Sequence, residues 1–383
     1  MQIAPPPLGV YVHLPWCVRK CPYCDFNSHE LRGPAPFDAY VDALLADLDE
    51  DLPLVAGREV GTVFFGGGTP SLCPPREVAR FLAGLSARLP LAAGAEITLE
   101  ANPGTVERGR FAELAAAGIN RVSLGVQSFQ PHLLAALGRI HDEREAHAAI
   151  AELRSAGLEN WNLDLMYGLP GQTAAEAAAD VEAAVAAGPP HLSLYQLTLE
   201  PGTPFHRRPP ALPDDDTCAE MEDSAVTRLE AMGYRRYEVS AWSRPGRECR
   251  HNLNYWNYGD YLGVGAGAHG KLTLADGRIL RRQRRRRPLG WLEGPRIEAE
   301  RVPGPADRLF EFMLNALRLS DGFRLEQFSA RTGLPPEAAL PGLRAASERG
   351  LVEQEDAGRW RPTDLGRRFL NDLQGLFLPG AGA

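Results

Sequence analysis

The sequence predicts an α/β fold, a partial (β/α)6 barrel followed by a mixed and helical, winged-helix-like region. Two observations predict it: short β-branched or aromatic runs alternate with longer Ala-, Leu- and Glu-rich segments up to about Leu199, and the alternation then stops. Such alternation is typical of repeated βα units around a parallel sheet. The expected strands are Val10–His13, Thr62–Phe65, Glu96–Glu100, Arg121–Val126, Trp161–Leu165 and His191–Leu197.

The segments between these strands are long enough for helices with one apolar stripe each. The expected helices are Asp38–Leu52, Pro75–Leu89, Val106–Ala117, Glu143–Ala156 and Ala174–Ala187. Six strands connected by helices predict an open barrel.

Parallel strands carry their functional residues at their C-terminal ends, where the loops converge. The unusual residues of this chain follow five of the expected strands, so these loops are expected to face one cavity. They are Cys17, Gly66–Pro70, Glu100–Pro103, Gln127–Ser128 and Asp164–Pro170.

We expect three units along the chain. Residues 1–205 form the barrel domain, residues 206–304 a connecting region, and residues 305–383 the C-terminal helical, winged-helix-like domain. A stretch rich in Pro and acidic residues, Glu200–Asp216, marks the first boundary. The C-terminal unit ends in a short hairpin of Gly350–Glu353 and Arg359–Pro362.

The composition is that of a soluble globular protein, with 44% hydrophobic and 23% charged residues. No apolar run approaches the roughly 20 residues that span a bilayer, and the N-terminus lacks the features of a secretory signal. A net charge of −8 argues against nucleic acid as the main partner. We therefore expect a cytoplasmic protein.

Three of the six cysteines, Cys17, Cys21 and Cys24, lie within eight residues. This spacing lets one irregular loop bring three thiolates to three irons of a cubane cluster. Two alternatives stay open: three free thiols, or a structural zinc site with His13 or His29 as the fourth ligand.

The cysteine motif, with Tyr23 directly before Cys24, resembles that of the radical S-adenosylmethionine superfamily. The resemblance implies a [4Fe–4S] cluster whose fourth iron binds the amino and carboxylate groups of S-adenosylmethionine. In that family the cofactor supplies the difficult chemistry, and the protein supplies ligation and orientation.

Four further segments, read together, resemble the oxygen-independent coproporphyrinogen III oxidase branch of that superfamily. They are Tyr11–Trp16, Gly66–Pro70, Gly125–Phe129 and Asp164–Pro170. The resemblance covers nearly the whole chain and implies that certain positions bind S-adenosylmethionine. These positions are Tyr11, Tyr23, Gly67, Gly68, Thr69, Glu100, Gln127, Arg139 and Asp164.

Two departures count against oxidase activity. The oxidase has a further cysteine two residues after the last cluster ligand, where this chain has Phe26, and it has a longer N-terminal extension than the ten residues before Tyr11. The continuation Cys24–Ser28 resembles the HemW family of heme chaperones more closely. We therefore expect a heme chaperone, with radical oxidative decarboxylation of a porphyrinogen as the alternative.

The motif His251–Trp256 matches one that the HemW resemblance connects with heme binding. A neutral imidazole ligates heme iron well, and flanking Tyr and Trp offer flat apolar faces to a porphyrin. We expect His251 to contact heme. A packed, hydrogen-bonded histidine remains the alternative.

The resemblance implies recipient hemoproteins as partners, membrane-bound respiratory enzymes among them, and leaves a peripheral membrane location and a homodimer open. Two features have no assigned role. Arg281–Arg287 is either a solvated face or a contact for heme propionates, anionic lipid or an acidic protein. His269 lies either near the S-adenosylmethionine site or in a structural turn.

Overall fold

A computed structural model describes residues 4–379 except 56, 105–108 and 356–357. Six parallel strands form the centre of a 12-stranded sheet in the order β1-β4-β5-β6-β7-β8. Each overlaps an expected strand, so the central prediction is confirmed. Their bounds are β1 Leu8–Leu14, β4 Val60–Gly67, β5 Leu91–Ala101, β6 Arg121–Gln127, β7 Trp161–Tyr167 and β8 His191–Gln196.

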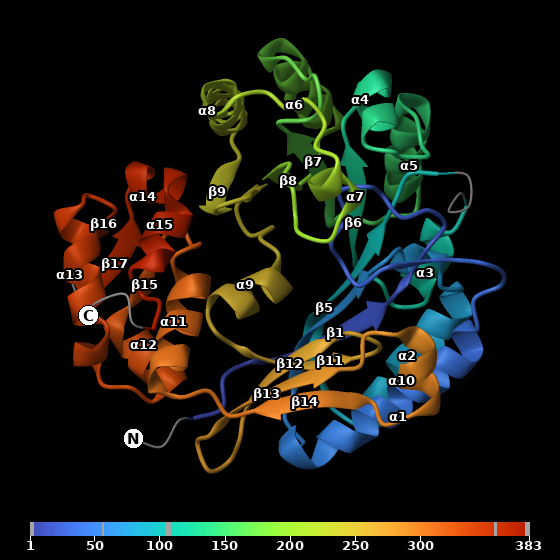
Figure 1. The fold of residues 1–383 in the computed structure, drawn as a ribbon. Helices are drawn as coiled ribbons and strands as arrows, with labels where there is room; N and C mark the ends of the chain where they lie inside the picture. The colour runs from blue at the N-terminus through green and yellow to red at the C-terminus, as the bar shows by residue number, and fades with distance from the viewer. Residues whose placement is uncertain (1–3, 56, 105–108, 356–357, 380–383) are drawn as a thin grey trace.

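Helices follow the strands and cover one face of this curved sheet (Figure 1). Five match the expected segments, although the first part of the expected helix Val106–Ala117 lies outside the described residues. The short helix α4 was not expected. The bounds are α1 Phe37–Val55, α2 Pro75–Ser86, α3 Phe111–Ala116, α4 Pro131–Ala136, α5 Glu143–Ser155 and α6 Ala174–Ala187.

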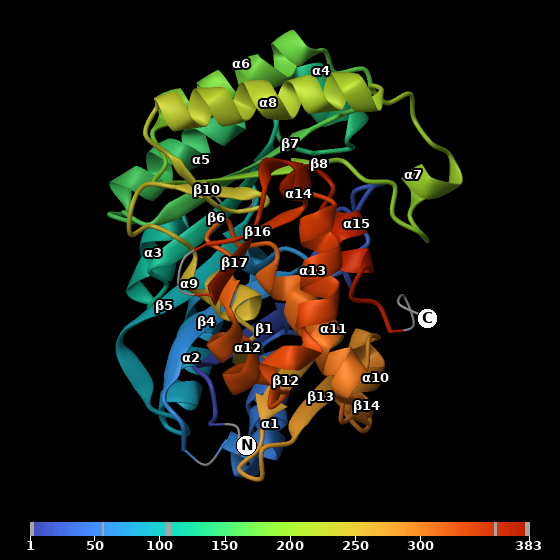
Figure 2. The ribbon, with the colours of Figure 1, turned by 90° about the vertical axis from the view of Figure 1, so that its left-hand side faces the viewer.

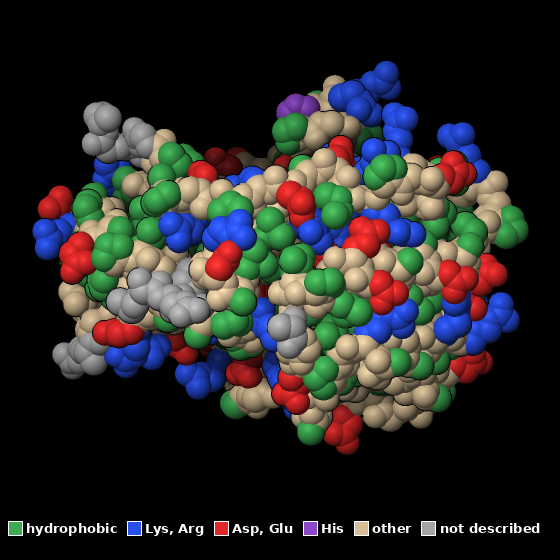
Figure 3. Space-filling model, turned by 90° about the horizontal axis from the view of Figure 1, so that it is seen from below, with side chains coloured by type: hydrophobic (Ala, Val, Ile, Leu, Met, Phe, Trp, Pro, Cys, Tyr) green, Lys and Arg blue, Asp and Glu red, His purple; other side chains and the backbone are tan. Residues whose placement is uncertain are grey.

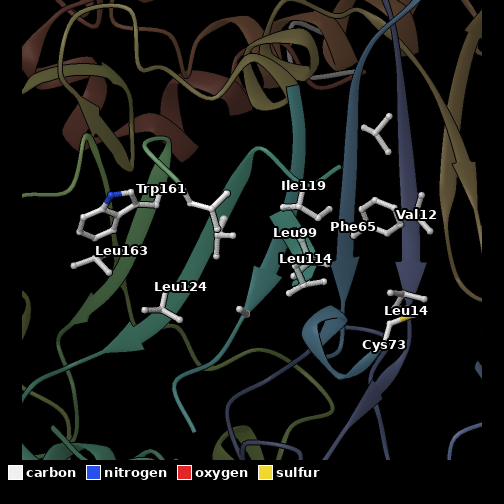
Figure 4. Packing of buried hydrophobic residues seen from close by; sticks show 14 of the residues in the cluster. Val12, Leu14, Phe65, Cys73, Leu99, Leu114, Ile119, Leu124, Trp161 and Leu163 are labelled. Carbon is white, nitrogen blue, oxygen red and sulfur yellow. The ribbon is translucent and has the colours of Figure 1, made fainter. Parts of the chain in front are cut away.

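The main core lies between the parallel strands and these helices. Val12, Phe65, Leu99, Leu124 and Leu163 are all buried and come from five successive strands (Figure 4). Burial of this apolar face from water is the largest favourable contribution to folding. It fixes which side chains of each strand point the other way, toward the concave face.

The connecting region, expected to be mixed, extends the same sheet at both edges. On one side β11 pairs in parallel with β1, and antiparallel β12, β13 and β14 follow it; on the other, β10 and β9 are added to β8. Helix α8, Asp215–Ala231, lies outside α6 (Figure 2). The added strands are β9 Arg235–Glu238, β10 Ala241–Ser243, β11 Asp260–Val264, β12 His269–Thr273, β13 Ile279–Arg284 and β14 Ile297–Arg301.

Helix α9, Arg250–Trp256, packs against the concave side of β1 and β4. Figure 1 shows it between the sheet and the C-terminal unit. The carboxylate of Glu96 on β5 accepts the backbone N–H groups of Arg250 and His251 at 3.1 and 3.0 Å. This helix therefore fills the barrel interior at the N-terminal ends of the strands.

The C-terminal unit consists of helices and a three-stranded antiparallel sheet, β15-β17-β16, with its own apolar core. This matches the expected winged-helix-like region, hairpin included. Its elements are α11 Pro305–Ala316, β15 Phe323–Arg324, α12 Leu325–Thr332, α13 Leu340–Glu348, β16 Val352–Gln354, β17 Arg359–Pro362, α14 Asp364–Arg368 and α15 Leu370–Gly375. The three domain ranges given above remain our proposal.

Within the described residues, no helix is both long and apolar enough to cross a membrane. On the face shown in Figure 3, basic and acidic side chains are interspersed without a large area of one sign.

Candidate functional site

A cavity of about 390 Å³ opens at the C-terminal ends of the six parallel strands. Residues at or just after the C-terminal ends of the six strands line it, and they include members of the five loops that the sequence predicted to face one cavity. Eleven of the predicted site residues are among them: Cys17, Cys21, Tyr23, Cys24, Gly67, Gly68, Thr69, Glu100, Gln127, Arg139 and Asp164.

The loop that carries the three cysteines is held by strand pairing and by a lysine side chain. Cys17 ends the short strand β2, Trp16–Cys17, which pairs in parallel with β3, His29–Glu30. The Lys20 ammonium donates to the carbonyl oxygens of Phe26 and Ser28 at 2.9 and 3.1 Å. These contacts close the loop into a compact turn around the cavity.

Two glycines, at the end of β4 and directly after it, allow the chain to approach this loop closely. A Cβ on Gly68 would lie 2.6 Å from the carbonyl oxygen of Trp16, and one on Gly67 would lie 2.7 Å from the His13 ring. Gly67 also has φ +119°, which L side chains rarely adopt. Gly68 N–H donates to the Leu14 carbonyl at 2.8 Å. Glycine is therefore required here by backbone contact.

Of the three thiols, Cys17 is buried, and Cys21 and Cys24 are partly exposed. Burial and the neighbouring thiols raise the pKa of Cys17, so a bound cation is needed to favour ionisation of this thiol. In the described part of the chain, no three His, Cys, Asp or Glu side chains gather closely enough to hold one metal ion.

His13, one proposed zinc ligand, has both ring nitrogens occupied. They contact the Tyr11 hydroxyl at 3.0 Å and the Asn27 carbonyl at 2.9 Å. Burial lowers the pKa of His13 to about 4, so the ring is neutral at pH 7. His29 contacts Asn27 Oδ1 at 3.3 Å. The zinc alternative therefore gains no support from this geometry.

Glu100 and Asp164 bring two carboxyl groups into the cavity. Burial and the nearby charge of Asp164 raise the pKa of Glu100 to about 8, although the Gly67 N–H, 3.2 Å from Oε2, opposes the shift. Burial also raises the pKa of Asp164, which accepts from Ser123 at 3.0 Å and Asn162 at 2.8 Å. The pair can accept hydrogen bonds from the hydroxyl and amino groups of a polar ligand.

Arg139 lines the cavity. Its guanidinium donates to the Gly125 carbonyl at 2.7 Å and to Asn102, and Nη1 lies 3.7 Å from the Cys21 sulfur. Asn102 also donates to Thr69 at 3.1 Å. The side chain predicted to pair with a carboxylate is thus fixed in place beside Cys21, one of the three predicted cluster ligands.

Two predicted residues lie outside this cavity. Tyr11 lies on β1 with its hydroxyl bonded to His13. His251 is 1% exposed, with its two ring nitrogens 2.8 Å from the Thr62 hydroxyl and 2.9 Å from the Tyr255 hydroxyl. Burial lowers the pKa of His251 to about 3. Its contact with heme stays a prediction, and ligation of iron would require one of these hydrogen bonds to break.

Comparison with known proteins decides the family. A model of the Radical SAM superfamily matches residues 11–184, and a model of the HemN C-terminal domain matches residues 305–369. The heme chaperone HemW of Escherichia coli (strain K12) is 51% identical over 97% of this chain and 98% of its own length. The chain belongs to the HemW family.

Other relatives agree. The heme chaperone HemW of Haemophilus influenzae is 44% identical over 97% of this chain and 98% of its own length, and that of a Synechocystis strain is 36% identical over 91% and 86%. A solved structure of coproporphyrinogen III oxidase (HemN) from Escherichia coli has a TM-score of 0.81 at 24% identity, covering 97% of this chain and 90% of its own. That likeness shows the fold alone.

Membership in the HemW family confirms the resemblance found in the sequence. The radical SAM domain, which contains Cys17, Cys21 and Cys24, implies a [4Fe–4S] cluster and S-adenosylmethionine as cofactors. Phe26, the residue that separated HemW from the oxidase in the sequence, lines the cavity and is 62% exposed. An exposed apolar side chain therefore lies on the wall of this cavity.

Several residues that shape the site had not been assigned a role from the sequence. Asn102 joins Thr69 to Arg139, and Ser123 with Asn162 orients Asp164. Asn102 was identifiable as a polar residue at a strand end. Ser123 and Asn162 lie inside strands on the concave face, where only the alternation of side chains would have pointed to them.

Proposed function

We propose that this protein is a heme chaperone that binds heme, holds a [4Fe–4S] cluster and S-adenosylmethionine, and delivers heme to recipient hemoproteins. The similarity of nearly the whole chain to relatives named heme chaperone HemW carries this proposal. Phe26 supports it over the oxidase alternative, because an apolar group occupies the position at which the oxidase has a cysteine.

Cys17, Cys21 and Cys24 are proposed to ligate the cluster. When bound, the cluster supplies an electron to S-adenosylmethionine, as in the radical family. Glu100 and Asp164 would accept hydrogen bonds from the hydroxyl and amino groups of S-adenosylmethionine. Arg139 would neutralise the carboxylate of this cofactor, and Tyr23 would cover its adenine. Tyr23 lies beside Phe205, with ring centroids 6.4 Å apart, in keeping with an apolar side to the cavity.

The surface next to the cysteine loop suggests which partners this protein binds. Arg285, Arg286 and Arg287 are exposed, and the carbonyl of Arg286 accepts the Asn27 amide at 2.9 Å. We include anionic membrane surfaces and membrane-bound respiratory enzymes among the proposed partners, since arginine binds phosphate and carboxylate well.

Cosedimentation with phosphatidylglycerol vesicles tests the membrane contact, with pure phosphatidylcholine vesicles as the control. Charge reversal of the three arginines should abolish the cosedimentation. Light scattering of the cluster-loaded protein tests the homodimer that the sequence left open: two chains per particle would support it, and one would exclude it.

Heme titration tests the main proposal. The anaerobic, cluster-loaded protein should bind about one heme per chain and pass it to an apo-hemoprotein whose absorbance reports uptake. The triple variant C17S/C21S/C24S should lose the iron and sulfide of the cluster. Absence of a Soret change on titration of the loaded protein would contradict the proposal.

A further inference from the structure

A second cavity, which we call the lateral groove, lies between the antiparallel extension of the sheet and α11. It has a volume of about 470 Å³. Strands β11 to β14 contribute Tyr261, His269, Arg281 and Arg301, and α11 contributes Phe310 and Leu314. The groove therefore joins aromatic, apolar, imidazole and guanidinium groups from two domains.

His269 begins β12 and lines this groove. Its neighbour two positions on, Lys271, pairs with Tyr261, so His269 and Tyr261 point to the same side of the sheet. Within the described residues the His269 imidazole has no hydrogen-bond or ion-pair partner, and the side chain is exposed. Partial burial and the charges of Arg281 and Arg286 lower the pKa of His269, which favours the neutral, ligating ring.

His251 and His269 differ in whether a ring nitrogen is available to bind iron. Both nitrogens of His251 are engaged and the residue is 1% exposed, whereas His269 offers a free nitrogen to an open space. An axial ligand of heme needs a free imidazole nitrogen beside a site for the porphyrin plane. Of these two histidines, His269 meets both conditions.

The rest of the groove suits a flat ligand with carboxylates. Phe310 and Leu314 lie one turn apart on α11, and Leu314 is 41% exposed, so they form an apolar wall. Arg281 and Arg301 share the carboxylate of Glu311, at 2.7 and 2.6 Å. Because two guanidinium groups share one carboxylate, some of their N–H donors and positive charge stay available for a further anion. The Arg301 side chain is 57% exposed, so it can reach such an anion at the rim of the groove.

Other charges face the groove as well. Arg282 pairs with Glu300 at 2.5 Å, and Asp307 lies 3.9 Å from Arg301. The carboxylate of Glu298 also acts on the His269 imidazole and raises its pKa, against the effect of burial and of the two arginines.

The groove is also tied to the cluster loop. His269 follows the turn Gly265–Ala268, in which Ala266 accepts a hydrogen bond from Asn27 at 2.9 Å. A Cβ on Gly267 would lie 2.2 Å from the same amide. A ligand on His269 would therefore adjoin the segment that follows the third cluster cysteine.

We propose that heme binds in the lateral groove with His269 as an axial ligand, its porphyrin against Phe310 and Leu314 and its carboxylates near Arg281 and Arg301. The proposal rests on the heme binding of the proposed function and assigns its site. It places heme outside the S-adenosylmethionine cavity.

Heme titration of three single variants tests this assignment. In the full-length, cluster-loaded protein, His269→Ala should weaken heme binding at least tenfold and change the Soret position. His132→Ala, which removes an exposed imidazole on α4, is the matched control and should bind as the wild type does. His251→Gln, which keeps hydrogen-bonding capacity, should retain the wild-type spectrum.

Added imidazole should restore the Soret band of His269→Ala, because it can occupy the vacated position. Arg301→Glu should weaken affinity without changing the ligand spectrum. A wild-type spectrum and affinity in His269→Ala, or loss of the ligand spectrum in His251→Gln alone, would overturn the assignment. If the wild-type protein bound no heme, the proposed function itself would fail.

Discussion

Glu100 lies at the end of β5, and its carboxylate is close to the charge of Asp164 and to the Gly67 amide. Its pKa of about 8 exceeds the ordinary value of 4.5. The folded state therefore binds the proton more tightly than the unfolded state, and stability should fall as pH rises from about 4.5 through about 8.

Glu100→Gln removes this titration while keeping nearly the same shape. Each pKa unit corresponds to about 1.4 kcal/mol, but the side chain is only partly buried in the open cavity. We therefore expect the titration of Glu100 to change the free energy of unfolding by about 1–2 kcal/mol. Urea unfolding at pH 5.5 and pH 8.5 measures it. The wild type should lose that much more stability over this range than the variant, and equal losses would contradict the prediction.

Gly68 is the second residue whose role can be tested directly. Gly68→Ala places a methyl group 2.6 Å from the Trp16 carbonyl, so the backbone beside Cys17 must shift. We expect a loss of about 1–3 kcal/mol in stability and most of the cluster iron after reconstitution. Gly375→Ala is the control, because a Cβ there meets nothing within 4 Å. Equal iron content in both variants would show that the close approach is not required.

At the scale of elements, Asp260 joins β11 and β12 to the rest of the molecule. Its carboxylate accepts hydrogen bonds from Lys271 at 2.9 Å, Arg58 at 2.7 Å and the Thr273 backbone at 2.8 Å. Asp260 is fully buried, so removing it leaves the Lys271 ammonium buried without its main partner.

Asp260→Ala should therefore destabilise the protein by about 3–5 kcal/mol. The matched control is Asp276→Ala on the turn after β12, where the ion pair with Arg278 is exposed to solvent, so its loss is expected to change the stability very little. Thermal unfolding of both variants measures the difference. Similar melting temperatures would show that the Asp260 contacts do not hold the extension.

The parallel strands could be predicted because each is a short apolar run followed by a helix with one apolar stripe. The antiparallel extension could not, because β13 reads as a basic run. In the structure, Arg282 and Arg284 pair with Asp51, more than 200 residues away in the chain, and Arg281 pairs with Glu311. In the second half of the run, Arg285–Arg287, all three residues are exposed.

The candidate site was predictable where a motif and a strand end coincide, as for Cys17, Gly67, Glu100 and Asp164. His251 shows the limit of this reasoning. The motif suggested a ligand, but the sequence does not show that α9 enters the barrel and that Thr62 and Tyr255 occupy both ring nitrogens. Which side chains share a face, and which are already hydrogen-bonded, depends on contacts between distant segments.

At the scale of the whole molecule, the C-terminal unit packs beside α9, on the side of the sheet away from α1 and α2 (Figures 1 and 2). Glu311 on α11 links it to the sheet through Arg281 and to Tyr258 at 2.7 Å, and Arg318 pairs with Glu238 at 2.9 Å. These contacts place the cofactor cavity and the lateral groove on one body. We therefore expect heme to bind to the intact chain.

The central claim is that the protein handles finished heme and does not make its precursor. The most direct measurement is an anaerobic assay of the cluster-loaded protein with S-adenosylmethionine, a reductant and coproporphyrinogen III, run beside a heme transfer assay on the same preparation. We predict transfer of about one heme per chain to the apo-acceptor and no protoporphyrinogen IX. Conversion of coproporphyrinogen III to protoporphyrinogen IX would contradict the account.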